Sequence, residues 1–301
     1  MSIQSVRDFF NKHNASATGL AALVAALDAK ASGKPLDPAL AGRVQDLLTV
    51  LGAGDLLNDL SAADATPLVP EIRQHLSFNA KLLYAETRAT SWSYGDDRLL
   101  EDVGEFARAH AHAIAKMIVP SLEGVAQRFA APGGAFLDIG VGVGGLAVEL
   151  AQLFPQLRIV GIDVFQPSLA LARARVEKAG LGKRIELREQ GAENLEDDKA
   201  FDLAWIPVPF IPERVLPAAA ERTQRSLRPG GWVIMSYANP EGLDAASVAC
   251  WRLRLSTWGG PQWSPGEAEK LLRDKGYAEV RTLPKPPGAP VGYAVGRRKP
   301  A

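Results

Sequence analysis

The sequence AFLDIGVGVGG, residues 135–145, joins a short apolar strand to a run of closely spaced glycines. Glycines at the end of a strand let the backbone turn tightly, and they let a ligand come into contact with the main chain. The next segment, LAVELAQLFP at 146–155, is typical of a helix, and free N–H groups at a helix start favour electron-rich ligand atoms. The pattern therefore predicts a ligand-binding turn between the first strand and the first helix of an α/β domain.

Downstream of this turn, apolar strands alternate with helices almost to the end of the chain. The further predicted strands are RIVGIDV at 158–164, RIELREQ at 184–190, FDLAWIPVP at 201–209, WVIMSYA at 232–238, and a closing pair at 277–284 and 291–299. The intervening segments have helical patterns, for example SLALARARVEKAG at 168–180, which ends at Gly180. Regular alternation of strand and helix indicates a mostly parallel sheet that helices cover on both faces.

The region before residue 131 has Ala-rich helical patterns and no hairpin signal. Apolar residues recur at spacings of three and four in segments 20–30, 40–51, 67–89, 97–118 and 120–130. The last two segments are separated at Pro120, which predicts the end of a helix there. We therefore expect two domains: residues 1–130, a helical cap or lid and candidate homodimerisation region, and residues 131–301, an α/β core domain.

Two aspartates stand at the ends of the first two core strands. Asp138 lies two residues before the first glycine, where a carboxylate would repel a pyrophosphate and attract a ligand with an ammonium and a sulfonium. Asp163 ends the second strand, where an acidic side chain can accept hydrogen bonds from both ribose hydroxyls of a nucleoside. Gly140, Gly142 and Gly145 also satisfy G-x-G-x-x-G, the pattern of nicotinamide dinucleotide sites, but this pattern alone is weak evidence. The carboxylate of Asp138 favours a cationic ligand over a nicotinamide dinucleotide, whose pyrophosphate it would repel.

Five segments, in this order, resemble the class I S-adenosylmethionine-dependent methyltransferases. They are LDIGVGVGG at 137–145, GIDV at 161–164, QGAENL at 190–195, FDLAW at 201–205 and LRPGGW at 227–232. The resemblance covers about residues 133–300. It implies a Rossmann-like, seven-stranded, mostly parallel sheet whose last strand is antiparallel, with 277–284 and 291–299 as the final two strands. It also implies that residues 131–301 bind S-adenosylmethionine as the cofactor.

The resemblance also assigns cofactor contacts to the ends of several strands. Asp138 and the glycine turn would line the methionine and ribose parts, and Asp163 would hold the ribose. Val164 and Phe165 would flank the adenine. The predicted cofactor-binding residues are Asp138, Gly140, Gly142, Gly144, Asp163, Val164, Phe165, Gln190, Gly191, Ala192, Glu193, Trp205 and Pro207.

The sequence departs from the family after the third strand, where the family usually has an acidic residue that contacts the adenine amine. In this chain Gly191 stands in the acidic position. The backbone N–H of Ala192 would still bind the adenine ring, and Gln190 or Glu193 would serve the amine.

The segment WIPVPF at 205–210 ends the fourth strand, at a place that faces the transferred methyl group in related enzymes. It is apolar and contains no Asn or Asp, which favours a small organic acceptor over a nucleic-acid base. Trp92 and Tyr94 lie in a candidate lid loop whose aromatic faces could stabilise a sulfonium, and His110 is a candidate general base. We take these three side chains as the predicted catalytic residues. The segment STWGGPQWSP at 256–265 is a candidate wall of the acceptor pocket.

Composition argues against several other kinds of partner. Lys and Arg together number 34, as do Asp and Glu, and a zero net charge gives no argument for nucleic-acid binding. One cysteine, Cys250, cannot form an internal disulfide, which fits a cytoplasmic location. No run of about 18 apolar residues predicts a membrane span, the N-terminus has no signal-peptide pattern, and no residue cluster has metal-ligand spacing.

Two other functions remain open at this stage. The aminobutyrate chain of the cofactor could cyclise and release methylthioadenosine, which the apolar wall at 205–210 permits. A non-catalytic partner protein could also retain the fold, although Asp138 and Asp163 argue against it. The favoured prediction is methyl transfer to a small organic acceptor in secondary metabolism.

Overall fold

The computed structural model describes residues 2–240, 242–285 and 289–300, and it divides into two compact units. The first unit spans Met1–Leu83 and the second spans Tyr84–Ala301. The sequence pattern changes near residue 130, whereas the compact units divide at residue 83. The physical reason is that the helices within residues 97–130 bury their apolar side chains in the core beside the sheet.

The first unit is helical. It contains α1 (Ile3–Ser32), α2 (Pro38–Val50) and α3 (Ala62–Lys81), and η1 (Leu82–Tyr84) follows. The side chain of Ser2 caps α1 by accepting a hydrogen bond from the backbone N–H of Ser5. Val24 and Leu27 of α1 pack with Ala65 and Val69 of α3 in a small core.

The third helix begins and ends earlier than the predicted segment 67–89. Its start is set by Ser61 and Asp64, which form a capping box by exchanging side-chain and backbone hydrogen bonds. Pro67 and Pro70 therefore both lie inside α3. The capping residues satisfy the free N–H groups of the first turn, so neither proline marks the start of the helix.

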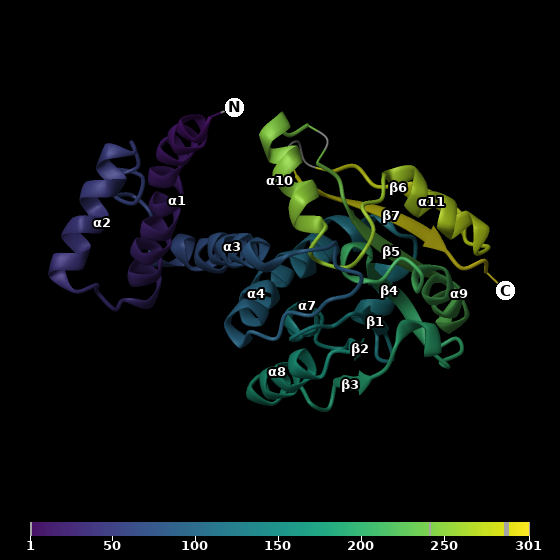
Figure 1. The fold of residues 1–301 in the computed structure, drawn as a ribbon. Helices are drawn as coiled ribbons and strands as arrows, with labels where there is room; N and C mark the ends of the chain where they lie inside the picture. The colour runs from purple at the N-terminus through teal and green to yellow at the C-terminus, as the bar shows by residue number, and fades with distance from the viewer. Residues whose placement is uncertain (1, 241, 286–288, 301) are drawn as a thin grey trace. The chain divides into compact units, whose positions relative to one another are not determined.

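Within its described residues, the second unit contains one seven-stranded sheet (Figure 1). Its strands are β1 (Ala135–Ile139), β2 (Arg158–Asp163), β3 (Ile185–Glu189), β4 (Phe201–Pro207), β5 (Leu227–Ala238), β6 (Ala278–Thr282) and β7 (Val291–Arg297). The order is β3-β2-β1-β4-β5-β7-β6, and β7 runs antiparallel to both of its neighbours. This confirms the predicted Rossmann-like fold with its antiparallel last strand.

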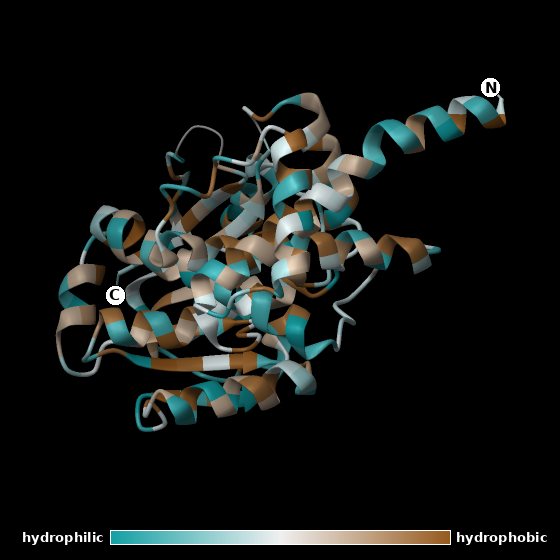
Figure 2. Cartoon of the chain, turned by 90° about the vertical axis from the view of Figure 1, so that its left-hand side faces the viewer, coloured by the Kyte–Doolittle hydropathy of each residue, from teal (hydrophilic) through white to brown (hydrophobic). Residues whose placement is uncertain are grey.

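Helices cover both faces of this sheet. The helices of this unit are α4 (Asp97–Ala113), α5 (Val119–Ser121), α6 (Val125–Ala130), α7 (Gly145–Leu153), α8 (Gln166–Lys178), α9 (Leu216–Ser226), α10 (Ala245–Leu255) and α11 (Pro265–Asp274), with the short turns η2 (Ile114–Ile118), η3 (Ala192–Asn194) and η4 (Val208–Phe210). Residues of α4 to α8 form one core with the sheet, and residues of α9 and α11 form the other. The helices alternate between hydrophilic and hydrophobic residues, as expected for elements with one buried side (Figure 2).

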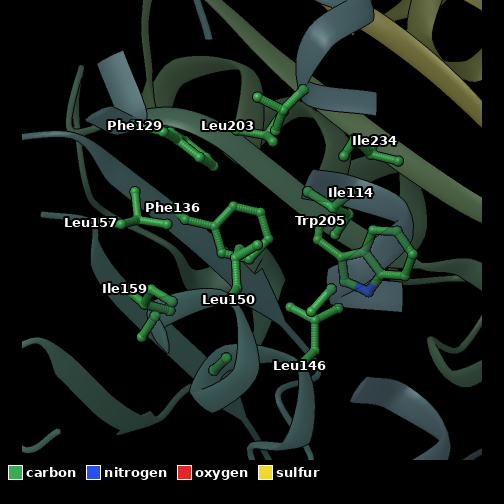
Figure 3. Close-up of a cluster of buried hydrophobic side chains, with 14 of the residues drawn as sticks. Ile114, Phe129, Phe136, Leu146, Leu150, Leu157, Ile159, Leu203, Trp205 and Ile234 are labelled. Atoms are coloured by element: carbon green, nitrogen blue, oxygen red, sulfur yellow. The ribbon is translucent and has the colours of Figure 1, made fainter. Parts of the chain in front are cut away.

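The hydrophobic core that α4 and α7 form with the sheet includes residues of the central strands β1 and β4. Phe136 of β1, Leu150 of α7 and Trp205 of β4 point into the same cluster (Figure 3). Trp205 is the register partner of Asp138 across the β1–β4 pair. Neighbouring residues in register place their side chains on the same face of the sheet, so Asp138 also faces α4 and α7.

The helical run that begins at Asp97 ends at Ser121, one residue after Pro120, so the predicted split lies close to the observed one. A π-helical segment, η2, precedes the proline, and the backbone N–H of Val119 donates to the carbonyl of Ile114, five residues back. The proline ring crowds the carbonyl four residues before it, and a wider turn relieves this clash. The break falls before α6, where Gly124 adopts a φ of 78°.

Candidate active site

The strand order reverses between β1 and β4, and the glycine turn leaves the sheet at this point. In open α/β sheets, ligands bind beyond the carboxyl ends of the strands at such a switch point. Gly140, Gly142 and Gly144 have φ values of 67°, 55° and 78°, which side-chain-bearing residues rarely adopt. The turn is held to β2 because the N–H groups of Gly140 and Val141 both donate to the carbonyl of Ile162, at 2.8 and 3.1 Å.

Asp138 is buried at the end of β1, with 2% of its surface exposed. Its Oδ2 atom has no hydrogen-bond partner among the described residues. Burial, and secondarily the nearby charge of Asp163, raises the pKa of Asp138 to about 8. A buried carboxyl without a partner is unfavourable by about 1–3 kcal/mol, and a cationic ligand group would satisfy it. This orphaned oxygen therefore fits a positively charged cofactor.

Asp163 closes the site from the end of β2. Its Oδ2 accepts a hydrogen bond from the N–H of Gly142 at 2.9 Å, and its Oδ1 accepts one from the N–H of Phe165 at 2.9 Å. Burial raises the pKa of Asp163, and the backbone hydrogen bonds partly offset this effect. Each carboxylate oxygen can still accept another hydrogen bond, so the side chain is oriented for a diol.

Gly145, the last glycine of the G-x-G-x-x-G pattern, serves helix packing. A Cβ atom placed on Gly145 would lie 2.0 Å from the carbonyl oxygen of Gly104 in α4. A Cβ atom on Gly104 would in turn lie 2.1 Å from a methyl carbon of Val143. The α4 backbone thus approaches the start of α7 closely. Gly104 carried no sequence signal that distinguished it from other helical glycines.

Beyond β3, Glu193 folds back over Gly191. A Cβ atom placed on Gly191 would lie 2.7 Å from Oε2 of Glu193 and 2.9 Å from its Cδ. The amide of Gln190 donates to the carbonyl of Asn194 at 2.8 Å. The carboxylate of Glu193 therefore occupies the space that a side chain at position 191 would need.

The remaining predicted cofactor residues differ in how far they are buried and in which residues they contact. Val164 is 69% exposed directly after β2, and Phe165 is half-buried, near Gly95. Ala192 is buried at the start of η3, and Pro207 packs beside Gly140, 3.4 Å from the position of an added Cβ.

His110 and Trp205 form one aromatic group beside Asp138. The ring of His110 lies 5.4 Å from that of Trp205, and Trp205 lies 6.0 Å from Tyr293 of β7. Burial lowers the pKa of His110 to about 4 and raises the pKa of Tyr293 to about 12. Both side chains are therefore uncharged at neutral pH. Sequence reasoning missed Tyr293, because only the β5–β7 pairing brings it here.

Trp92 and Tyr94 belong to a second group, which we call the aromatic row. Its members are Tyr94, Trp92, Phe210, Trp258 and Trp251, and successive ring centroids are 5.0, 5.5, 4.8 and 6.0 Å apart. Phe210 and Trp258 are stacked, with an interplanar angle of 16°. The predicted catalytic residues Trp92 and His110 thus lie in different aromatic groups.

Backbone contacts join the three segments that supply the aromatic row. The N–H of Ala89 donates to the carbonyl of Ser256 at 2.9 Å, and the N–H of Gly260 donates to the carbonyl of Pro209 at 3.0 Å. A Cβ on Gly259 would lie 2.5 Å from the backbone of Ser91. The structure therefore brings together the predicted lid loop, the end of β4 and the segment after α10.

Within residues 2–240, 242–285 and 289–300, no three or more His, Cys, Asp or Glu side chains are grouped so that they could hold a metal ion. No described helix has the length and apolar character that crossing a bilayer requires.

A family model described as a methyltransferase domain matches residues 136–231. This match begins in β1 and ends in β5, so it includes the glycine turn, Asp163 and the end of β4.

Several curated proteins are similar in sequence. A phosphatidylethanolamine N-methyltransferase of Cereibacter sphaeroides is 34% identical over 166 residues, which cover 52% of this chain and 77% of that protein. PigF, an S-adenosyl-L-methionine-dependent methyl transferase of a Serratia species, is 25% identical over 66% of this chain and 60% of its own length. A release factor glutamine methyltransferase of Geobacter sulfurreducens is 36% identical over 35% of this chain. The chain spans 38% of the length of this last relative, and less than two thirds of PigF.

Solved structures share the fold along nearly the whole chain. An O-methyltransferase family protein of Burkholderia thailandensis has a TM-score of 0.65 at 18% identity and covers 100% of this chain and 99% of its own. The mitomycin 7-O-methyltransferase MmcR has a TM-score of 0.65 at 19% identity, with 98% of each chain covered. At these identities the likeness establishes the fold.

Proposed function

Because this chain belongs to the class I S-adenosylmethionine-dependent methyltransferases, we propose that it transfers a methyl group from S-adenosylmethionine to a small organic acceptor in secondary metabolism. The observation that carries this proposal is the buried carboxyl of Asp138, whose Oδ2 lacks a partner beside the glycine turn. A dinucleotide would bring phosphates to this carboxyl, whereas a cofactor with an ammonium and a sulfonium compensates it.

The cofactor-binding residues then have distinct roles. Asp138 and the backbone of Gly140, Gly142 and Gly144 line the methionine and ribose parts. Asp163 accepts hydrogen bonds from the ribose hydroxyls, because its two oxygens are already oriented by backbone N–H groups. Val164 and Phe165 flank the adenine.

Glu193 supplies the acidic contact that the chain lacks at position 191. Its carboxylate lies over Gly191, and an adenine amine donates hydrogen bonds that a carboxylate accepts strongly. Gln190 serves instead to hold η3, since its amide nitrogen is bonded to the carbonyl of Asn194. The N–H of Ala192 binds the adenine ring.

When bound, the cofactor supplies a methyl group on a sulfonium. The acceptor's lone pair forms a bond to the methyl carbon while the electron pair of the carbon–sulfur bond returns to sulfur. The protein holds the acceptor in line with that bond. In well-oriented reactions, such positioning lowers the activation free energy by about 7–11 kcal/mol. Trp205 and Pro207 bound the site from β4. The aromatic row, with Trp92 and Tyr94, forms the wall against which a flat acceptor packs.

His110 acts mainly by position. A pKa of about 4 makes its neutral imidazole a weak base, so His110 orients the acceptor beside Trp205 and does not take a proton from it. The site therefore suits acceptors whose nucleophilic atom is ionised or unprotonated at neutral pH.

Product analysis tests this function directly. The purified protein is incubated with S-adenosylmethionine and a panel of phenols, thiols and amines, and the products are separated by mass. S-adenosylhomocysteine together with a methylated acceptor is the expected result. Methylthioadenosine would indicate cyclisation instead, and absence of cofactor binding in a calorimetric titration would indicate a non-catalytic partner protein.

A further inference from the structure

Arg254 is a half-buried cation near the C-terminal end of α10. Its Nε is buried without a hydrogen-bond partner, and among the described residues no carboxylate oxygen lies within salt-bridge distance of its guanidinium. By contrast, Arg175 of α8 is paired with Glu101 and Glu105 of α4. Arg254 thus carries a charge that the described part of the chain does not balance.

The surroundings of Arg254 do not favour its charge. Burial lowers the pKa of Arg254, and the one neighbouring group that acts in the opposite direction is Cys250. A thiol is a weak hydrogen-bonding group and is no substitute for a carboxylate. A partly desolvated guanidinium without a counter-ion is unfavourable, and an anion that arrives from outside would be bound by charge-assisted hydrogen bonds.

Arg254 also stands at one end of the aromatic row. Its guanidinium carbon lies 5.5 Å from the centroid of the Trp251 ring, which is 6.0 Å from Trp258. Trp258 stacks on Phe210, three residues after the end of β4. Trp251, Phe210, Trp92 and Tyr94 are half-buried residues, whereas Trp258 between them is buried, with 8% of its surface exposed. A flat molecule lying along these rings could place an acidic group at Arg254.

We propose that the methyl acceptor is an aromatic or similarly flat molecule with a carboxylate, which pairs with Arg254 while its apolar body packs on the aromatic row. This inference rests on the proposed methyltransferase function, and it names the chemical class of the acceptor. It follows from an unbalanced guanidinium beside Trp251, at one end of the aromatic row. Arginine is suited to the task because its planar fork binds a carboxylate through two parallel hydrogen bonds.

The test compares matched probes on matched variants of the full chain. The probes are hydroxylated aromatic acids, such as a hydroxybenzoate and a hydroxycinnamate, each with its uncharged primary amide. The variants are Arg254→Gln, Arg254→Lys and Arg252→Gln, because Arg252 is an exposed arginine on the same helix. Binding is followed by tryptophan fluorescence in protein saturated with S-adenosylhomocysteine, and folding of each variant is checked by thermal unfolding.

We expect the wild-type protein to bind at least one acid roughly tenfold or more tightly than its amide. Arg254→Gln should abolish this difference, Arg254→Lys should retain part of it, and Arg252→Gln should leave it intact. Equal binding of acids and amides, the same response in Arg254→Gln and Arg252→Gln, or no binding of any acid would each overturn the inference. Failure of S-adenosylhomocysteine to bind would instead contradict the proposed function, so the two failures are distinguishable.

Discussion

We expect Asp138 to make cofactor binding depend on pH. Burial raises the pKa of Asp138 to about 8, so below that pH the carboxyl of the free site is largely protonated, whereas a cationic cofactor favours the ionised form. Affinity for S-adenosylmethionine should therefore rise as the pH is raised from about 6 to about 9. Calorimetric titration at several pH values, with Asp138→Asn as the comparison, measures this.

The amide variant removes the titrating group but keeps its shape, so it separates the protein's contribution from any titration of the cofactor. Asp138→Asn should bind more weakly at the higher pH and should lose the protein's share of the pH dependence. Parallel pH profiles for the two proteins would contradict the role of Asp138.

Asp163 should contribute to affinity through charge-assisted hydrogen bonds. Asp163→Ala is expected to weaken S-adenosylmethionine binding by about 1–3 kcal/mol. The loss has two sources, since the same carboxylate also holds the N–H groups of Gly142 and Phe165. Asp198→Ala is a suitable control, because Asp198 is exposed and pairs only loosely with Lys199 at 3.6 Å. Unchanged affinity in Asp163→Ala would remove the assigned ribose contact.

At the scale of elements, the crossing of α4 and α7 depends on two glycines. Gly145→Ala would place a Cβ atom 2.0 Å from the carbonyl oxygen of Gly104, so one of the helices must shift. Overpacking of this kind should lower the free energy of unfolding by about 1–3 kcal/mol, measured by urea denaturation. Gly182→Ala is the control, because nothing lies within 4 Å of a Cβ at that position.

Ion pairs also connect α4 to its neighbouring helices α7 and α8. Arg175 of α8 bonds to Glu101 and Glu105 of α4, and Arg108 of α4 pairs with Glu149 of α7 at 2.7 Å. These contacts connect α4 to the two helices that follow the glycine turn and Asp163. We therefore expect Gly145→Ala to reduce cofactor affinity as well as stability, and a variant with normal affinity would limit the role of Gly145 to packing.

At the scale of the whole molecule, the two compact units have separate hydrophobic cores. Scanning calorimetry should therefore resolve two unfolding transitions, since units with independent cores unfold as separate cooperative bodies. S-adenosylhomocysteine should raise the transition of residues 84–301, because ligand binding stabilises the folded form that binds it. A single transition that moves as one with added ligand would show instead that the units unfold together.

Local pattern was sufficient to predict the α/β core. Strand periodicity, the glycine turn and the aspartates that end β1 and β2 are properties of short segments, so the sheet and the turn after β1 could be predicted before any packing was known. The predicted end of a helix at Pro120 lies one residue before the observed end at Ser121, because a π turn carries the helical run past the proline. The start of α3 was misplaced because the capping box at Ser61 lies before the segment that showed periodicity.

Contacts between distant segments could not be predicted in this way. Gly104 meets Gly145, Glu193 covers Gly191, and Arg254 joins the aromatic row only because helices and loops far apart in sequence are packed onto one sheet. No single segment encodes such neighbours, because they depend on the registers and crossings of many elements at once. The chain's own residue pattern thus specifies the fold and the turn that carries Asp138, whereas packing in three dimensions decides which side chains from distant segments lie beside that turn.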